Sequence, residues 1–151
     1  MPNPTIEAVR ALDVSELAEI LRESEALGYR FLRRLVEEWQ GGTNRFEGPG
    51  EALFVARVEG RLVGVCGLNR DPYASEPRVG RVRHLYVAQE WRGRGVGAAL
   101  VRHVIQEARG AFDVLRLRAA DGAAGFFFAR LGFVPTSDIP GCTHLVELRG
   151  L

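Results

Sequence analysis

The residues best suited to chemistry form one short run, residues 92–97, in which arginine and glycine alternate. Glycine at 93, 95 and 97 has no Cβ atom, so an anion can approach the backbone N–H groups, and each glycine can adopt a positive φ angle. A helix is predicted to begin near Gly95, and the first N–H groups of a helix have no partner within it. The run therefore predicts a phosphate-binding loop, to which Arg92 and Arg94 add positive charge.

The elements on either side of the loop follow from hydrophobic spacing. Residues 79–87 form an apolar strand, and small or apolar residues recur after the loop at the helical spacing of 97, 100, 101, 104, 105 and 108. Gly93, Gly95 and Ala98 also match the G-x-G-x-x-G/A fingerprint of dinucleotide-binding proteins. In that fingerprint the glycines follow the strand directly, whereas residues 88–92 intervene here. A dinucleotide-binding protein is therefore the less favoured alternative.

The run also resembles the Arg/Gln-x-x-Gly-x-Gly/Ala motif of the GNAT superfamily of acetyl-CoA-dependent N-acetyltransferases, as Arg92-Gly93-Arg94-Gly95-Val96-Gly97. The preceding Leu85-Tyr86-Val87 and the later Phe128-Ala129-Arg130-Leu131-Gly132-Phe133 are similar to that family's pattern in order and spacing. The resemblance covers nearly the whole chain. It implies acetyl-CoA as co-substrate, no metal, and an amine as the acceptor of the acetyl group.

The resemblance further implies that the cofactor pyrophosphate binds the loop and that the pantetheine arm lies where two parallel strands splay apart. The cofactor-binding residues expected on this basis are Leu85, Tyr86, Val87, Arg92, Gly93, Arg94, Gly95, Val96, Gly97, Ala98, Asp121 and Phe128. Many members have a tyrosine at the position of Phe128, where its hydroxyl protonates the leaving thiolate. A phenyl ring cannot do this, so we expect the thiolate to leave unaided or to take a proton from water or Tyr86.

The family's usual base, a carboxylate or histidine on the strand before the loop, is replaced by Arg81 and Arg83. A guanidinium stays charged at neutral pH and cannot accept a proton. Both arginines should point to the same side of the strand, where they bind either an anionic acceptor or acidic neighbours such as Glu51 or Glu76. His84 should point to the opposite side and pack behind the sheet.

The catalytic side chains are not identified by this pattern, and Tyr86 and His144 are weak candidates. The residues expected to contact the acceptor are Arg81, Arg83, Tyr73 and His144, with Arg116 and Arg118 extending the basic patch. The segment 29–46 could form one wall of the acceptor pocket, but its aromatic residues are interpreted primarily as core.

A site without a base favours a weakly basic acceptor. At pH 7 an α-amine of pKa ~8 is about 10% neutral, whereas a side-chain amine of pKa ~10.4 is about 0.04% neutral. We therefore hypothesise direct attack on the thioester by a small amine, with a carboxylate-bearing α-amine as the candidate acceptor. A non-catalytic acyl-CoA-binding module is the alternative that the missing tyrosine and base leave open.

Composition restricts the class of protein. The chain has 151 residues, 46% of them hydrophobic and 26% charged, and a net charge of +1, which favour one globular domain over residues 1–151 with no nucleic-acid or membrane partner. No apolar run approaches ~18 residues and no signal peptide is visible, so a cytoplasmic location is expected. All twenty basic residues are arginine, which suggests a GC-rich bacterial genome. Cys66 and Cys142 are predicted to be free thiols, and a homodimer is left open.

The order of elements predicts the fold class, α/β (α+β). We expect a single mixed, mostly antiparallel sheet of six to seven strands, with helices on both faces and a parallel splayed strand pair at the centre. Asp13 and Glu16 suggest a capping box for the first helix, and Glu59-Gly60 suggests a hairpin turn. The predicted strands are residues 5–11, 52–58, 61–69, 79–87, 113–118, 133–136 and 143–148, and the predicted helices are 13–25, 29–39, 95–108 and 123–131.

Overall fold

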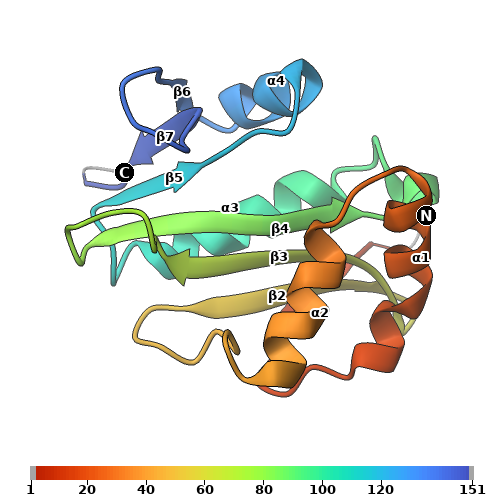
Figure 1. Ribbon diagram of the computed structural model, residues 1–151. Helices are drawn as coiled ribbons and strands as arrows, with labels where there is room; N and C mark the ends of the chain where they lie inside the picture. Colours follow the sequence, from red (N-terminus) through yellow and green to blue (C-terminus); the bar gives the residue numbers. More distant parts are fainter. Residues whose placement is uncertain (1–2, 150–151) are drawn as a thin grey trace.

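The computed structural model describes residues 3–149, which form a seven-stranded sheet with helices on both of its faces (Figure 1). The strand order is β1-β2-β3-β4-β5-β7-β6. The strands are β1 (Thr5–Ala8), β2 (Ala52–Val58), β3 (Arg61–Arg70), β4 (Val79–Val87), β5 (Val114–Leu117), β6 (Val134–Pro135) and β7 (His144–Glu147). The helices are α1 (Ala18–Ala26), α2 (Phe31–Gly41), α3 (Val96–Ala108) and α4 (Gly122–Arg130), with short 3₁₀ turns at η1 (Val14–Leu17) and η2 (Gln89–Trp91). The expected mixed sheet is confirmed.

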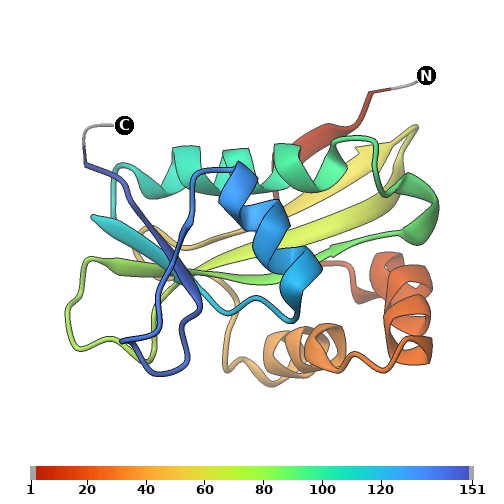
Figure 2. The same cartoon turned by 90° about the horizontal axis from the view of Figure 1, so that it is seen from above.

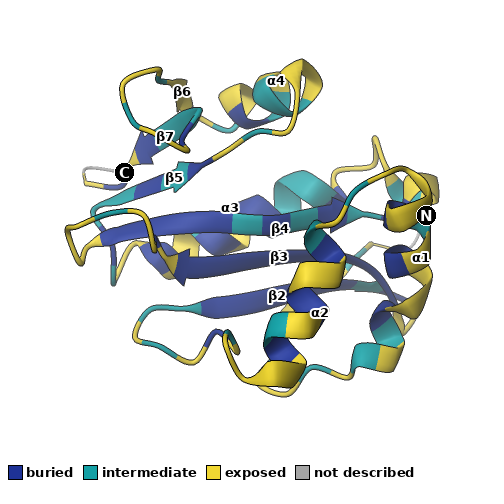
Figure 3. Ribbon diagram, viewed as in Figure 1, coloured by how far each residue is buried: buried dark blue, intermediate teal, exposed yellow. Residues whose placement is uncertain are grey.

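The sheet separates two layers of helices. Seen from above, α3 covers one face, and α1 and α2 cover the other (Figure 2). Strands β2, β3 and β4 are buried along most of their length between these layers (Figure 3). Within the described residues, no helix is long and apolar enough to cross a lipid bilayer.

The antiparallel part of the sheet agrees with the predicted hairpin. Strands β2 and β3 pair through the Glu59-Gly60 turn, where both residues have positive φ, 51° and 82°. Positive φ at both central residues suits the right-handed twist of the two strands. The capping box was only half correct. Asp13 accepts a hydrogen bond from the backbone N–H of Ser15, but the Glu16 carboxylate pairs with Arg57 of β2 instead of returning to the cap.

Strands β4 and β5 separate after a short paired segment. Strand β4 pairs with β5 only over residues 79–81, opposite residues 114–116. Beyond Arg81, β4 continues to Val87 while β5 ends at Leu117. The backbone groups on this edge of β4 are therefore available to a ligand, because no neighbouring strand uses them.

A bulge in β4 changes which side chains share a face. His84 and Leu85 both lie opposite the single residue Cys66 of β3, and His84 has a left-handed φ of 59°. The extra residue turns the His84 ring to the α2 side, where it lies 6.5 Å from the ring of Phe31. The prediction that His84 packs behind the sheet was therefore wrong, because strict alternation holds only where the strand is regular.

Candidate active site

The loop between β4 and α3 has the shape of an anion site. Gly93 and Gly95 have φ of 74° and 85°, and Gly95 is the N-cap of α3. A Cβ atom added at either position would meet nothing within 4 Å, so the loop is open on that side. Gly97 serves another purpose, because a Cβ there would lie 3.3 Å from the Phe127 ring of α4. We therefore assign Gly93 and Gly95 to anion approach and Gly97 to close packing of the two helices.

The arginines of the loop brace it. The Nε of Arg92 donates to the carbonyl oxygen of Val87 at 3.0 Å, and its guanidinium lies 5.0 Å from the centre of the Tyr86 ring. The Arg94 guanidinium lies 4.9 Å from the centre of the Trp91 ring. Both charges stay near the start of α3, where they add to the positive potential of the helix N-terminus.

A cavity of about 450 Å³, here called the loop cavity, lies between this loop and α4. Every residue expected to bind the cofactor lines it except Arg94 and Phe128. Asp121 holds one wall in place, because its carboxylate caps α4 by accepting from the N–H of Ala124 at 2.9 Å. Residues that the sequence analysis did not assign to the cofactor also line the loop cavity: Tyr29, Phe31, Trp91, Ala120, Ala123, Ala124 and Phe127.

The Tyr86 hydroxyl points to α1. It donates to a carboxylate oxygen of Glu23, which also accepts from the backbone N–H of Gln89 at 3.1 Å. Burial, and then the neighbouring Glu23 carboxylate, raise the pKa of Tyr86 above its usual range. The hydroxyl proton is therefore directed to Glu23, and this contact ties α1 to the start of the loop.

A second cavity, of about 380 Å³, adjoins the loop cavity on the α2 side of the gap between β4 and β5. We call it the arginine cavity, because Arg34, Arg81, Arg83 and Arg118 line it. The two cavities meet at shared wall residues, which are Phe31, Leu85, Ala120, Ala124 and Phe127. The two cavities are therefore adjacent.

The charge of Arg81 is balanced by a buried carboxylate. Its guanidinium donates to the carbonyl oxygen of Gly141 at 2.8 Å, lies 3.7 Å from the buried carboxylate of Asp71, and stacks 4.9 Å from the centre of the Tyr73 ring. The acidic partner is thus Asp71, not the expected Glu51 or Glu76. Tyr73, which was expected to contact the acceptor, lines the arginine cavity and covers this pair.

Arg83 has no carboxylate partner within residues 3–149. Its side chain makes a long hydrogen bond of 3.4 Å to the amide oxygen of Asn69. Asn69 is held by Asn44 and by Glu51, whose carboxylate it contacts at 3.0 Å. The half-buried Arg83 guanidinium therefore faces the cavity with no carboxylate bound to it.

His84 lies beside Arg83 in the same cavity. It is only 8% exposed, and both of its ring nitrogens lack a hydrogen-bond partner. Burial, followed by the positive charge of Arg83, lowers the pKa of His84 to about 4. The Phe31 backbone opposes this shift, and the charge of Arg34 adds a smaller lowering effect. The imidazole is therefore neutral at pH 7 and has a free lone pair in the cavity. The sequence pattern missed this residue.

His144 and Phe128 differ in whether they line a cavity. The Nδ1 atom of His144 is 2.8 Å from the Thr143 hydroxyl, and its ring packs against Gly125, so that it lines none of the three cavities described here. The expectation that His144 reaches the pocket was wrong. Phe128 does line the arginine cavity, where its ring packs 5.5 Å from the ring of Phe133.

Both cysteines are free and buried, as predicted. Burial raises the pKa of the Cys66 thiol to about 12, and the Cys142 thiol donates to the carbonyl oxygen of His144 at 3.2 Å. Neither cysteine lines a cavity described here. Neither thiol is therefore placed to act as a nucleophile.

A glycine loop at a helix N-terminus, beside a parallel strand pair that opens, defines the acetyl-CoA-dependent transferase class that the sequence resembles. Residues 49–135 match the family model of the acetyltransferase (GNAT) domain, and this match spans more than half of the chain. The chain belongs to the GNAT acetyltransferase family.

Curated relatives agree with this assignment. An uncharacterised N-acetyltransferase of Methanocaldococcus jannaschii is 30% identical over 102 residues, which cover 64% of this chain and 45% of that protein. The N-acetylaspartate synthetase of Xenopus tropicalis is 32% identical over 104 residues, 64% of this chain and 37% of that protein. The chain therefore spans less than half the length of these two relatives.

Solved structures share the fold over nearly the whole chain. A protein from Exiguobacterium sp. 255-15, proposed to be an acetyltransferase, superposes with a TM-score of 0.85 at 29% identity, covering 96% of this chain and 93% of that one. The GNAT N-acetyltransferase YhbS from Escherichia coli, solved with CoA, gives a TM-score of 0.69 at 15% identity, over 98% of this chain and 83% of that one.

Proposed function

We propose that this protein transfers an acetyl group from acetyl-CoA to the α-amine of a small molecule that carries a carboxylate. The observation that carries the proposal is the junction of two cavities at the gap between β4 and β5. One cavity contains an open, glycine-rich anion loop, and the other contains arginine charge with no carboxylate among its lining residues. A phosphorylated cofactor suits the first, and an anionic acceptor suits the second.

The loop cavity fits acetyl-CoA. Gly93 and Gly95 leave open the space that Cβ atoms would occupy, so a pyrophosphate can approach the backbone N–H groups at the start of α3. The unpaired edge of β4 offers further backbone groups to an extended arm. Bound acetyl-CoA would supply a thioester that a neutral amine can attack directly.

The relatives' names describe very different acceptors. Besides the N-acetylaspartate synthetase, an aminoglycoside 2'-N-acetyltransferase of Mycolicibacterium fortuitum is 38% identical over 58 residues, 38% of this chain and 29% of that protein. An aminoglycoside carries several positive charges, which the three arginines of the arginine cavity without a carboxylate partner within residues 3–149 would repel. The charge of this cavity therefore favours an amino-acid acceptor.

Arg83 and His84 supply the two functions that this acceptor needs. The Arg83 guanidinium can bind the acceptor carboxylate in a two-pronged geometry. The neutral His84 imidazole can accept the amine proton as the new C–N bond forms and the C–S bond breaks. A carboxylate bound beside Arg83 offsets the positive charge that lowers the pKa of His84, so the bound acceptor itself makes His84 a better base.

A thiol-release assay with a panel of amines tests this proposal. We expect release of CoA thiol with α-amino acids and little with polyamines, aminoglycosides or lysine side chains. Arg83→Ala should raise the acceptor KM at least tenfold and leave acetyl-CoA affinity unchanged. Arg70→Ala, at the exposed end of β3, is the matched control and should change neither value.

Four results would contradict the proposal. A preference for polycationic amines, or an unchanged acceptor KM in Arg83→Ala, would exclude an acceptor whose carboxylate binds Arg83. Acetyl-CoA binding by calorimetry without thiol release from any amine would instead indicate a non-catalytic acyl-CoA-binding module. Binding of NAD in place of acetyl-CoA would favour a dinucleotide-binding protein.

A further inference from the structure

The arginine cavity holds more positive charge than one carboxylate can neutralise. Arg34 comes from α2, Arg83 from β4 and Arg118 from the segment that follows β5. No aspartate or glutamate is among the residues that line this cavity, and within residues 3–149 none of these three arginines makes an ion pair. Arg81, the fourth arginine, is balanced by Asp71.

Arginines on other surfaces of the molecule behave differently. Several of them bind carboxylates directly, as Arg33 binds Glu25 at 2.8 Å and Arg149 binds Asp113 at 2.9 Å. Arg34 and Arg118 are exposed to water, which solvates their charge, so the fold does not depend on them. Their guanidinium groups therefore remain available to a ligand in the cavity.

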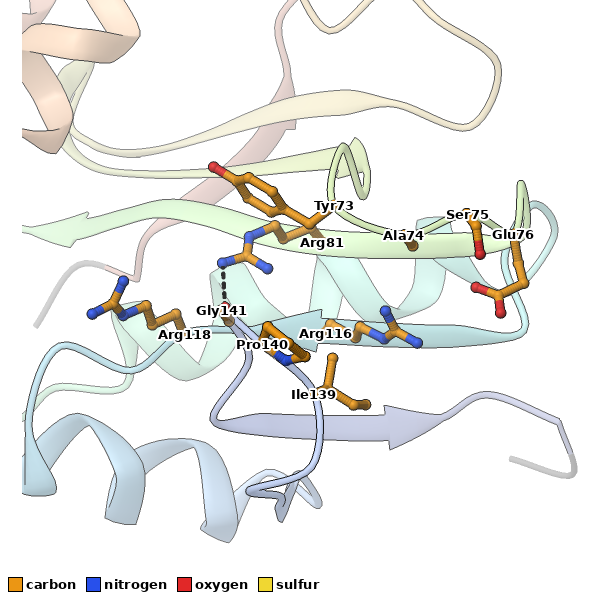
Figure 4. Close-up of a pocket in the computed structure, with 10 residues that line it drawn as sticks. All are labelled: Tyr73, Ala74, Ser75, Glu76, Arg81, Arg116, Arg118, Ile139, Pro140 and Gly141. Carbon is orange, nitrogen blue, oxygen red and sulfur yellow. Dashed lines mark hydrogen bonds between the residues drawn. The ribbon is translucent and has the colours of Figure 1, made fainter.

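The directions of their side chains separate Arg118 from Arg116. Arg116 and Arg118 both line a third cavity of about 640 Å³, here called the outer cavity, together with Tyr73 and Glu76. Figure 4 shows that the two side chains extend in opposite directions along the sheet, with Arg116 on the side of Glu76. Only Arg118 also lines the arginine cavity. The outer cavity thus continues the arginine cavity past Arg118.

We propose that the acceptor carries a second anionic group, which binds Arg118 and Arg34 while its α-carboxylate binds Arg83. This inference rests on the proposed function, since it describes the acceptor of the same site. The acceptor class is an α-amine with two anionic groups. The second group is a carboxylate in an amino dicarboxylic acid or a phosphate in a phosphorylated amino acid, and both suit the planar guanidinium.

The KM values of matched acceptors test this inference. L-Alanine and L-serine carry one anionic group, L-aspartate and L-glutamate carry two carboxylates, and O-phospho-L-serine carries a carboxylate and a phosphate. Each charge-assisted hydrogen bond corresponds to about a ten- to hundredfold change in affinity. We therefore expect a KM at least tenfold lower for one of the two dianionic classes than for alanine or serine. The class with the lower KM identifies the second group.

Variants then assign the second group to its partners. Arg118→Gln should raise the KM of the preferred dianionic acceptor about tenfold or more and leave the KM of alanine unchanged. Arg34→Gln should give the same pattern from the opposite wall, which guards against a local defect in either variant. Arg102→Gln is the matched control, because Arg102 of α3 is exposed and lines none of the three cavities. It should leave both KM values unchanged.

The outcomes separate this inference from the proposed function. Equal KM values for alanine, serine and the dianionic acceptors would overturn the second anionic group and leave the proposed function standing. An equal effect of Arg118→Gln on alanine and on the dianionic acceptor would overturn it as well. If no α-amine causes release of CoA thiol from acetyl-CoA, the proposed function itself is overturned.

Discussion

Phe128 cannot donate a proton to the leaving thiolate. It occupies the position at which many family members carry a tyrosine, and its ring lines the arginine cavity without a hydroxyl. We predict that Phe128→Tyr leaves turnover unchanged or raises it, because it adds a proton donor near the leaving thiolate. Steady-state thiol release checks this, with thermal unfolding as the control for the fold. A large loss of turnover in a folded variant would mean that the apolar ring itself is required.

His84 is the residue that we propose accepts the proton of the acceptor amine. We predict that His84→Gln lowers kcat about a hundredfold at pH 7, because glutamine cannot take the amine proton, while calorimetric affinity for acetyl-CoA stays the same. For the wild type, kcat/KM should rise from pH 5.5 to 8 with the neutral fraction of the α-amine. No inflection from an enzyme group near pH 6.5 is expected, because the pKa of His84 lies at about 4. Equal kcat in His84→Gln would exclude His84 as the base.

Some residues of the candidate site could be predicted from the sequence and others could not. The anion loop and the loss of the tyrosine at Phe128 could be predicted because they lie in a local motif. The bulge that brings His84 into the cavity could not, since alternation along β4 assumes a regular strand. The only hint was residue type, because histidine tolerates positive φ better than most residues. The prediction that His144 reaches the pocket failed because of a tertiary contact. Its position on the last strand did not show that its ring packs against Gly125 of α4.

Among the elements, the turn from β4 into α3 is the one that we propose binds the cofactor. We predict that Gly95→Asp lowers acetyl-CoA affinity at least a hundredfold, because it adds a negative charge and a Cβ to the open side of the loop. The control is Gly60→Asp in the β2–β3 turn, where φ is also positive, at 82°, and a Cβ also meets nothing within 4 Å. Calorimetry should show normal affinity in the control. Equal losses in both variants would assign the effect to backbone strain.

Element boundaries were predictable where the pattern was local. The hairpin of β2 and β3, the extent of β4 and the start of α3 were predicted correctly from alternation, turn residues and helical spacing. The first strand ends at Ala8 rather than at residue 11, and the role of Gly97 was missed, since its contact with Phe127 joins segments far apart in the sequence. The pairing of Arg81 with Asp71 is likewise a tertiary contact.

At the scale of the whole molecule, His84 should also govern stability in weak acid. Its pKa is about 4 in the folded protein against about 6.5 when unfolded, so the unfolded state binds more protons between these values. The contribution of neutral His84 to the free energy of unfolding is fully present above pH 6.5. This contribution decreases by about 3 kcal/mol as the pH falls to about 4. Partly exposed carboxylates such as Asp113, whose pKa is lowered by Arg149 and Arg78, lose their contribution only at lower pH.

Urea unfolding between pH 7 and 4 measures this dependence. We predict that the free energy of unfolding of the wild type decreases over this range, and that the decrease is smaller by about 3 kcal/mol in His84→Phe. Phenylalanine keeps the aromatic contacts with Phe31 and Phe46 but cannot be protonated. The same slope in both proteins would contradict a buried, neutral His84.

The loop cavity and the arginine cavity are adjacent, and the proposed function requires an acetyl group to pass from a thioester in the first to an amine in the second. The most direct measurement is mass-spectrometric quantification of the product, with acetyl-CoA and the preferred α-amino acid, alongside the CoA released. We predict one N-acetylated amine for each CoA, with transfer reduced at least tenfold in Arg83→Ala at acceptor concentrations below KM. Release of CoA without an acetylated amine, or no release under conditions where acetyl-CoA binds, would contradict it.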